Sequence, residues 1–175
     1  MEILLLGGAP NVGKKEAMYR LTRRLIGNKF KVVAIDSSKK KKLEELSDFK
    51  VVAEKKYRGK MCRIIINSSS NTIQDIKNFK EFYDENGEYN ILISSIIDVN
   101  TSIDNKFYPR KEFFKIMEIT ENENLLEIPF GKTRKASNRD WYQEKLDKLI
   151  DYILANKPYN VKWLSISTKP LLNNF

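Results

Sequence analysis

The feature that most constrains this chain is its N-terminal segment, which reads as a strand, a glycine-containing loop and an amphipathic helix in succession. The apolar run from Glu2 to Leu6 predicts a buried strand. Residues 14–26 repeat apolar side chains at helical spacing, and Gly27 is predicted to end that helix in a left-handed conformation. A strand followed by a helix begins the alternation that is typical of a parallel sheet covered by helices.

The same alternation continues along the rest of the chain, which predicts an α/β fold of three layers with a mainly parallel sheet. A glycine-containing turn at residues 57–60 joins two apolar runs and predicts one antiparallel hairpin. We expect one domain over residues 1–157, followed by a tail at residues 158–175. The further strands are predicted at Phe30 to Ile35, Val51 to Lys56, Met61 to Ile66, Tyr89 to Ile97 and Leu125 to Ile128.

Three further helices are predicted after the hairpin. Asn71 and Gln74 form a capping-box-like start to the first, which carries Ile73, Ile76, Phe79 and Tyr83 and ends at Asn86-Gly87. The second follows Arg110 and buries a stripe around Phe113, Phe114, Ile116 and Met117, and the third spans residues 140–155.

Composition excludes several kinds of catalytic site. Among 175 residues there is no histidine and a single cysteine, Cys62, so neither a histidine-based triad nor a common zinc set can be assembled. The start of the chain lacks a signal-peptide pattern, and no run approaches the roughly 20 apolar residues that span a bilayer. We therefore expect a cytoplasmic protein without a membrane partner. The net charge of +9 is spread along a lysine-rich chain, so nucleic-acid binding is possible but not favoured.

The loop after the first strand has the pattern G-x-x-x-x-G-K. Glycines there let successive backbone N–H groups turn towards an anion, and the helix N-terminus adds partial positive charge. Lys14 is placed to reach terminal phosphates. The candidate nucleotide-binding residues are Gly8, Ala9, Pro10, Asn11, Val12, Gly13, Lys14 and Lys15.

This loop resembles the Walker A motif of P-loop NTPases, and the alternation of strands and helices is similar to that superfamily to about residue 157. Gly-Ala-Pro is similar to nucleotide and nucleoside kinases, whereas Asn-Val-Gly-Lys is similar to small GTPases. The Asp-x-x-Gly and Asn-Lys-x-Asp motifs of GTPases are missing, so the kinase-like branch fits better. It implies a base-contacting segment before the last helix, here the basic residues 129–135 with Lys132 and Arg134.

The residue after the loop lysine departs from the family pattern. A hydroxyl at or beside that position usually helps to hold Mg²⁺, but Lys15-Glu16 offers none. A second ammonium beside a dication costs electrostatic energy. Lys15 therefore either weakens Mg²⁺-dependent turnover or points outward into water.

The remaining roles in phosphoryl transfer fall to strand ends and to a cation after a loop. Asp36 and Asp98 each follow a predicted strand, where they could hold Mg²⁺ or accept a proton from a substrate hydroxyl. Arg110 follows a polar loop and suits a lid over phosphates. Asn67 and the serines after it are candidates for an acceptor pocket.

Three hypotheses about function follow. The first is a phosphotransferase resembling nucleotide or nucleoside kinases, which uses ATP or another nucleoside triphosphate with Mg²⁺ and a small acceptor. The second is a degenerate or regulatory nucleotide-binding module without efficient turnover, and the third is a GTPase-like or basic nucleic-acid-binding protein. Oligomeric state, base and acceptor stay open.

Overall fold

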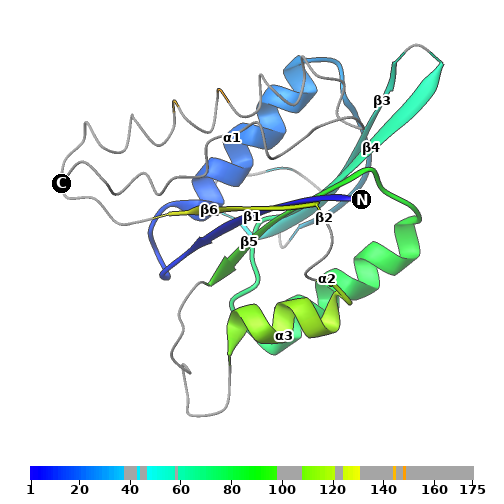
Figure 1. Ribbon diagram of the computed structural model, residues 1–175. Helices are drawn as coiled ribbons and strands as arrows, with labels where there is room; N and C mark the ends of the chain where they lie inside the picture. The colour runs from blue at the N-terminus through cyan, green and yellow to red at the C-terminus, as the bar shows by residue number, and fades with distance from the viewer. Residues whose placement is uncertain are drawn as a thin grey trace.

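The fold is a mixed, mostly parallel sheet with helices on both faces, so the predicted α/β class is confirmed (Figure 1). The computed structural model describes residues 1–37, 43, 47–57, 59–97, 108–120, 124–130, 144 and 148. Within these residues it has six strands and three helices. They are β1 (Glu2–Gly8), α1 (Lys14–Gly27), β2 (Lys31–Ser37), β3 (Phe49–Tyr57), β4 (Lys60–Asn67), α2 (Ile73–Asn86), β5 (Ile91–Ile97), α3 (Pro109–Ile116) and β6 (Asn124–Pro129).

The strands lie in the order β2-β3-β4-β5-β1-β6. β4, β5, β1 and β6 run parallel, whereas β3 is antiparallel to both of its neighbours. The expected hairpin is β3 and β4, with Gly59 at a φ of 84° in the turn between them. All strands but β3 therefore end at the same side of the sheet, which we call the carboxyl edge. Ligands of open α/β sheets bind at this edge.

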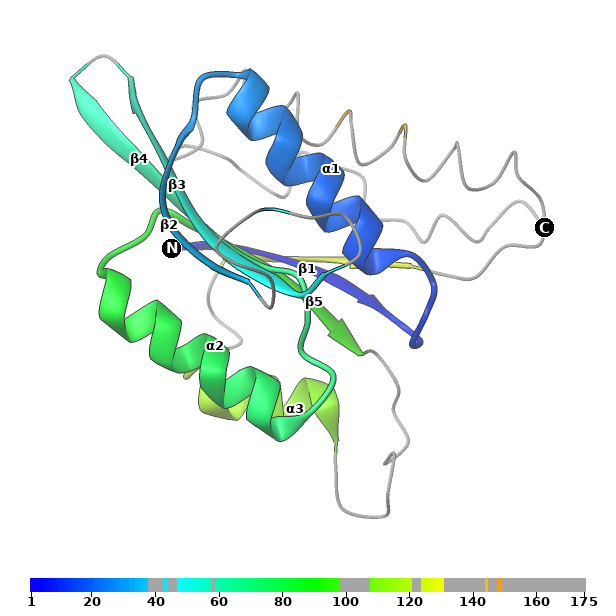
Figure 2. The same cartoon turned by 180° about the vertical axis from the view of Figure 1, so that it is seen from behind.

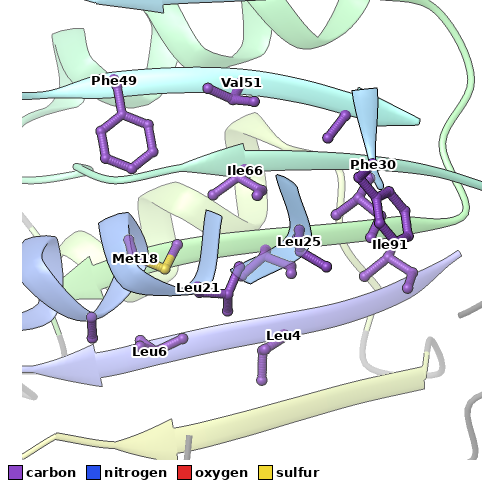
Figure 3. Close-up of a cluster of buried hydrophobic side chains, with 14 of the residues drawn as sticks. Leu4, Leu6, Met18, Leu21, Leu25, Phe30, Phe49, Val51, Ile66 and Ile91 are labelled. Atoms are coloured by element: carbon purple, nitrogen blue, oxygen red, sulfur yellow. The ribbon is translucent and has the colours of Figure 1, made fainter. Parts of the chain in front are cut away.

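Among the described helices, α1 lies on one face of the sheet, and α2 and α3 lie side by side on the other (Figure 2). The rings of Phe79 and Phe113 stack between α2 and α3, with centroids 6.3 Å apart. Figure 3 shows the cluster under α1, where Met18, Leu21 and Leu25 pack on strand side chains. Burial of each such side chain stabilises the folded state by about 1.5–3 kcal/mol, which holds the helices against both faces of the sheet.

The end of α1 differs from the expectation at Gly27. Gly27 is the last helical residue, and Lys29 adopts the left-handed conformation, with a φ of 68°. The N–H of Phe30 bonds to the carbonyl of Leu25 at 3.1 Å. This turn places the Phe30 ring in the core, where 4% of it is exposed. Burial of that ring outweighs the small steric penalty that Lys29 carries in a left-handed turn.

The start of α2 also differs from the expected capping by Asn71 and Gln74. Thr72 is the N-cap residue, and its hydroxyl accepts from the N–H of Asp75 at 3.1 Å while the Asp75 carboxylate accepts from the N–H of Thr72 at 3.0 Å. The helix consequently turns Ile73 towards solvent, with 39% exposed. Its buried residues are Ile76, Phe79 and Phe82. The helix ends as expected, with Gly87 following Asn86.

Some expectations fall outside the described residues. These are the helix at 140–155, apart from Glu144 and Lys148, the basic loop at 131–139 and the tail at 158–175.

Candidate functional site

The loop between β1 and α1 begins where two strands end close together. The N–H of Phe130 donates to the carbonyl of Gly7 at 2.6 Å, which continues the β1 and β6 pairing beyond Pro129. A Cβ built on Gly8 would lie 2.2 Å from the carbonyl oxygen of Phe130. Only glycine fits this position, because real Cβ atoms do not approach backbone that closely.

The loop then turns through two residues with positive φ, Asn11 at 60° and Gly13 at 98°. Asparagine and glycine are the residue types that adopt this conformation most readily. Gly13 is the N-cap of α1 and has no side-chain capping bond. The residues of the loop that are exposed to solvent are Ala9, Pro10, Asn11 and Gly13.

Several backbone N–H groups of the loop and first helical turn are available to a ligand. Within the described ranges, the first hydrogen bond that α1 makes back to the loop is from the N–H of Ala17 to the carbonyl of Gly13, at 3.1 Å. Helix N-termini leave such donors unsatisfied and carry partial positive charge. No acceptor in the described part of the chain takes the N–H groups of Ala9, Asn11, Val12, Gly13, Lys15 or Glu16.

The side chain of Lys14 folds back over the loop. Its ammonium donates to the carbonyls of Gly8, at 2.6 Å, and Ala9, at 2.7 Å, and the residue is 7% exposed. These contacts hold a positive charge against the carbonyls at the start of the loop. An anion held there would meet both a cation and main-chain donors, as the sequence pattern predicts.

Lys15 leaves the loop and binds a different segment. Its ammonium lies 2.8 Å from a carboxylate oxygen of Asp48, which directly precedes β3. The Lys15 side chain is 35% exposed, so this ion pair lies at the surface. Of the two expected arrangements, the outward one is present, with the ammonium paired with Asp48 at the surface.

Asp36 is placed far from the loop. It lies near the end of β2, and β3, β4 and β5 separate it from β1. Four interstrand spacings of about 4.8 Å put the two strand ends roughly 19 Å apart. Asp36 instead forms an ion pair with Lys50 on β3. The structure therefore does not bring Asp36 together with Lys14.

Arg110 lies in the first turn of α3 and is engaged with the sheet. Its guanidinium donates to a carboxylate oxygen of Glu127 on β6 at 2.7 Å and stacks on the Phe114 ring, 4.4 Å from the centroid. Movement of Arg110 onto a phosphate would require breaking both contacts, so the structure favours an anchor for α3 over a lid.

The other candidate residues lie outside the described part of the chain: Asp98, Lys132 and Arg134. Two described residues that come shortly before these candidates in the chain lie beside Gly8. Ile97 pairs with Gly8 across β5 and β1, and Phe130 is the residue whose carbonyl approaches Gly8.

A buried polar cluster beside β5 was not predicted as a unit. Asn67 lies at the end of β4, and its amide nitrogen lies 2.8 Å from the carbonyl of Ser69 and 3.0 Å from the hydroxyl of Ser94. The hydroxyl of Ser95 donates to the carbonyl of Ser68 at 2.6 Å. These bonds fix the loop after β4 at the carboxyl edge. Two consecutive serines inside an otherwise apolar central strand were the available signal.

No group of three or more His, Cys, Asp or Glu side chains that could hold a metal ion occurs among the described residues. Across the same ranges, no helix has both the length and the apolar character needed to cross a bilayer. In comparisons with known proteins, no family model, curated protein or solved structure matches this chain.

Proposed function

We propose that the loop from Gly8 to Glu16 binds the phosphates of a nucleoside triphosphate such as ATP, and that the protein transfers a phosphoryl group to a small acceptor. The observation that carries this proposal is the set of available main-chain donors around Lys14 at the carboxyl edge. Backbone donors and an ammonium stabilise the charge of a transferred phosphoryl group. The resemblance to P-loop kinases and the α/β fold support the same reading.

A second candidate function is a nucleotide-binding module without efficient turnover. The sequence supports it, because Lys15 and Glu16 place no hydroxyl after Lys14 to help hold Mg²⁺. In the kinase reading, Asp98 is the carboxylate to test, since it follows Ile97, the partner of Gly8. Lys132 and Arg134 follow Phe130 in the chain and are the candidates for contact with the base.

The experiment compares ATP binding to the wild type, Lys14→Ala and Lys15→Ala by thermal stabilisation and calorimetry. A ligand at 100 times its dissociation constant stabilises a protein by about 2.7 kcal/mol. We expect this stabilisation in the wild type and in Lys15→Ala, and its loss in Lys14→Ala. Lys15 is the matched control because it is also a lysine in the first turn of α1.

Turnover then separates the two candidates. Release of ADP that depends on Mg²⁺ and on an added nucleoside or nucleotide, and that Asp98→Asn abolishes, would support the phosphotransferase. ATP binding without ADP release under any of these conditions would support the module. Equal ATP binding by the wild type and Lys14→Ala would refute both.

A further inference from the structure

A cavity of about 230 Å³ opens at the carboxyl edge beside the ends of β2 and β4 and the start of β3. We call it the edge cavity. The side chains that matter for its chemistry are Asp36, Asp48, Lys50, Asn67, Asp75 and Asn78. It is smaller than the roughly 300–1,000 Å³ of pockets for drug-sized ligands, so its guest is small.

One buried side chain at this cavity has an unused acceptor. Asn67 is 2% exposed, and its amide nitrogen donates within the loop that follows β4. The carbonyl of Ser69 can only accept, which fixes the nitrogen on that side and turns the amide oxygen away from it. That oxygen accepts no hydrogen bond from the described part of the chain. The Asn67 oxygen is not among the fully buried side-chain atoms that lack a hydrogen-bond partner in the described residues, so it is not sealed from solvent. A hydroxyl or amino group in the cavity would be able to donate to it.

The charge of the lining defines the chemistry of the guest. Three carboxylates and one ammonium line the cavity. Lys50 pairs with Asp36, Lys15 approaches Asp48 from outside, and the Asp75 carboxylate accepts two backbone N–H groups. Counting Lys15, the carboxylates still exceed the ammonium groups by one, in a chain whose net charge is +9. Such a lining repels a phosphate and suits hydroxyl or amino groups.

The edge cavity adjoins the loop through Asp48. The Asp48 carboxylate lines the cavity and binds the ammonium of Lys15, the residue next to Lys14. β4 is separated from β1 by β5 alone, so Asn67 and the loop lie on strands about 10 Å apart. A guest of the cavity and a phosphate on the loop would therefore share the carboxyl edge.

We propose that the edge cavity is the acceptor site, and that it binds an uncharged or cationic polyhydroxylated molecule of nucleoside size or smaller and disfavours phosphorylated ones. Its role as acceptor site rests on the proposed function. A hydroxyl oxygen of the guest forms a bond to the γ-phosphorus of the triphosphate as the bond from that phosphorus to the bridging oxygen breaks. The nucleoside diphosphate leaves, and the hydroxyl proton passes to solvent.

The test measures binding to the full chain without nucleotide. The probes are the four ribonucleosides and 2-deoxystreptamine, each nucleoside paired with its 5′-monophosphate. Asn78→Trp fills the cavity from a half-exposed helix position, and Lys77→Trp, an exposed position of the same helix outside the lining, is the matched control. We expect at least one probe to bind the wild type and the control, and to bind Asn78→Trp at least tenfold more weakly. The monophosphate of a nucleoside that binds should be at least tenfold weaker than the nucleoside.

Several results would overturn the proposal. These are no probe binding at millimolar concentration, equal binding by Asn78→Trp and the wild type, or monophosphates that bind as well as nucleosides. ATP binding is scored separately with Lys14→Ala. ATP binding without probe binding would refute the edge cavity and leave the proposed function standing, whereas probe binding without ATP binding would refute the acceptor role.

Discussion

The two halves of the carboxyl edge offer opposite chemistry. After β1, the edge has main-chain donors and the ammonium of Lys14, with a backbone so close to β6 that only Gly8 fits. Beside β2, β3 and β4, it has a cavity with an excess of carboxylates and an unused amide oxygen on Asn67. The first half suits an anion and the second suits a donor of hydrogen bonds. A protein that transfers a phosphoryl group from a polyphosphate to a hydroxyl needs both.

Gly8→Ala should disrupt the loop after β1, and its expected loss of stability is the largest of those predicted here. Its Cβ would clash with the carbonyl of Phe130, so β1 and β6 must separate. Overpacking of this kind costs about 1–3 kcal/mol. Urea unfolding measures the loss, and ATP binding should be lost as well.

The matched control for that variant is Gly27→Ala. No atom lies within 4 Å of a Cβ at Gly27, which is the last residue of α1. Alanine is favoured over glycine in helices by up to about 1 kcal/mol, so this variant should be as stable as the wild type or more so. If Gly8→Ala unfolded at the same urea concentration as Gly27→Ala, the close approach of the two strands would be disproved.

Thr72→Ala should destabilise α2, which lines the edge cavity, without affecting the loop after β1. It removes the hydroxyl that caps α2, and loss of an N-cap costs about 0.5–2 kcal/mol. Asn71→Ala, at the position that sequence alone suggested, should cost less. Denaturant unfolding of both variants checks the order, and ATP binding should stay unchanged in each. A larger loss in Asn71→Ala would contradict the capping by Thr72.

Lys15→Ala tests the link between the two halves and should change stability little. The ion pair with Asp48 is partly exposed to solvent, and exposed pairs contribute about 0.2–1 kcal/mol. A double-mutant cycle with Asp48→Asn, measured by urea unfolding at low and at high salt, isolates the pair. A coupling energy that was zero at low salt would show that Lys15 and Asp48 do not interact in solution.

Cys62 is buried on the face of the sheet under α1, and its thiol should be unreactive near neutral pH. Burial raises the pKa of its thiol from 9.0 to about 12. Thiol reagents react with the thiolate, so labelling of the folded protein at pH 8 should be far slower than in urea. The folded state keeps a proton that the unfolded state releases, so the free energy of unfolding should fall as the pH rises above 9.0. Labelling at equal rates in both states would contradict the packing.

Local features of the fold could be predicted from the sequence, and long-range ones could not. The strand before Gly8, the helix after Gly13 and the hairpin around Gly59 follow from apolar periodicity and glycine positions. The left-handed turn at Lys29 was missed because burial of Phe30 decided it. That burial depends on strands distant in the sequence.

In the candidate site, too, local features could be predicted from the sequence and long-range contacts could not. Lys14 and its loop could be predicted because the motif is continuous in sequence. The pairing of Lys15 with Asp48 joins residues 33 apart, and no local pattern indicates it. Asp36 looked suitable because it follows a strand, but the hairpin of β3 and β4 lies between β2 and the parallel part of the sheet.

The most direct test of the central claim is a titration of the ¹⁵N-labelled protein with ATP, followed by amide chemical shifts. If the loop binds phosphate through its backbone, the amides of residues 9, 11–13, 15 and 16 should shift most, in the direction of stronger hydrogen bonds. The amides around the edge cavity should shift little. Unchanged loop amides at saturating ATP, or shifts confined to other surfaces, would contradict the account.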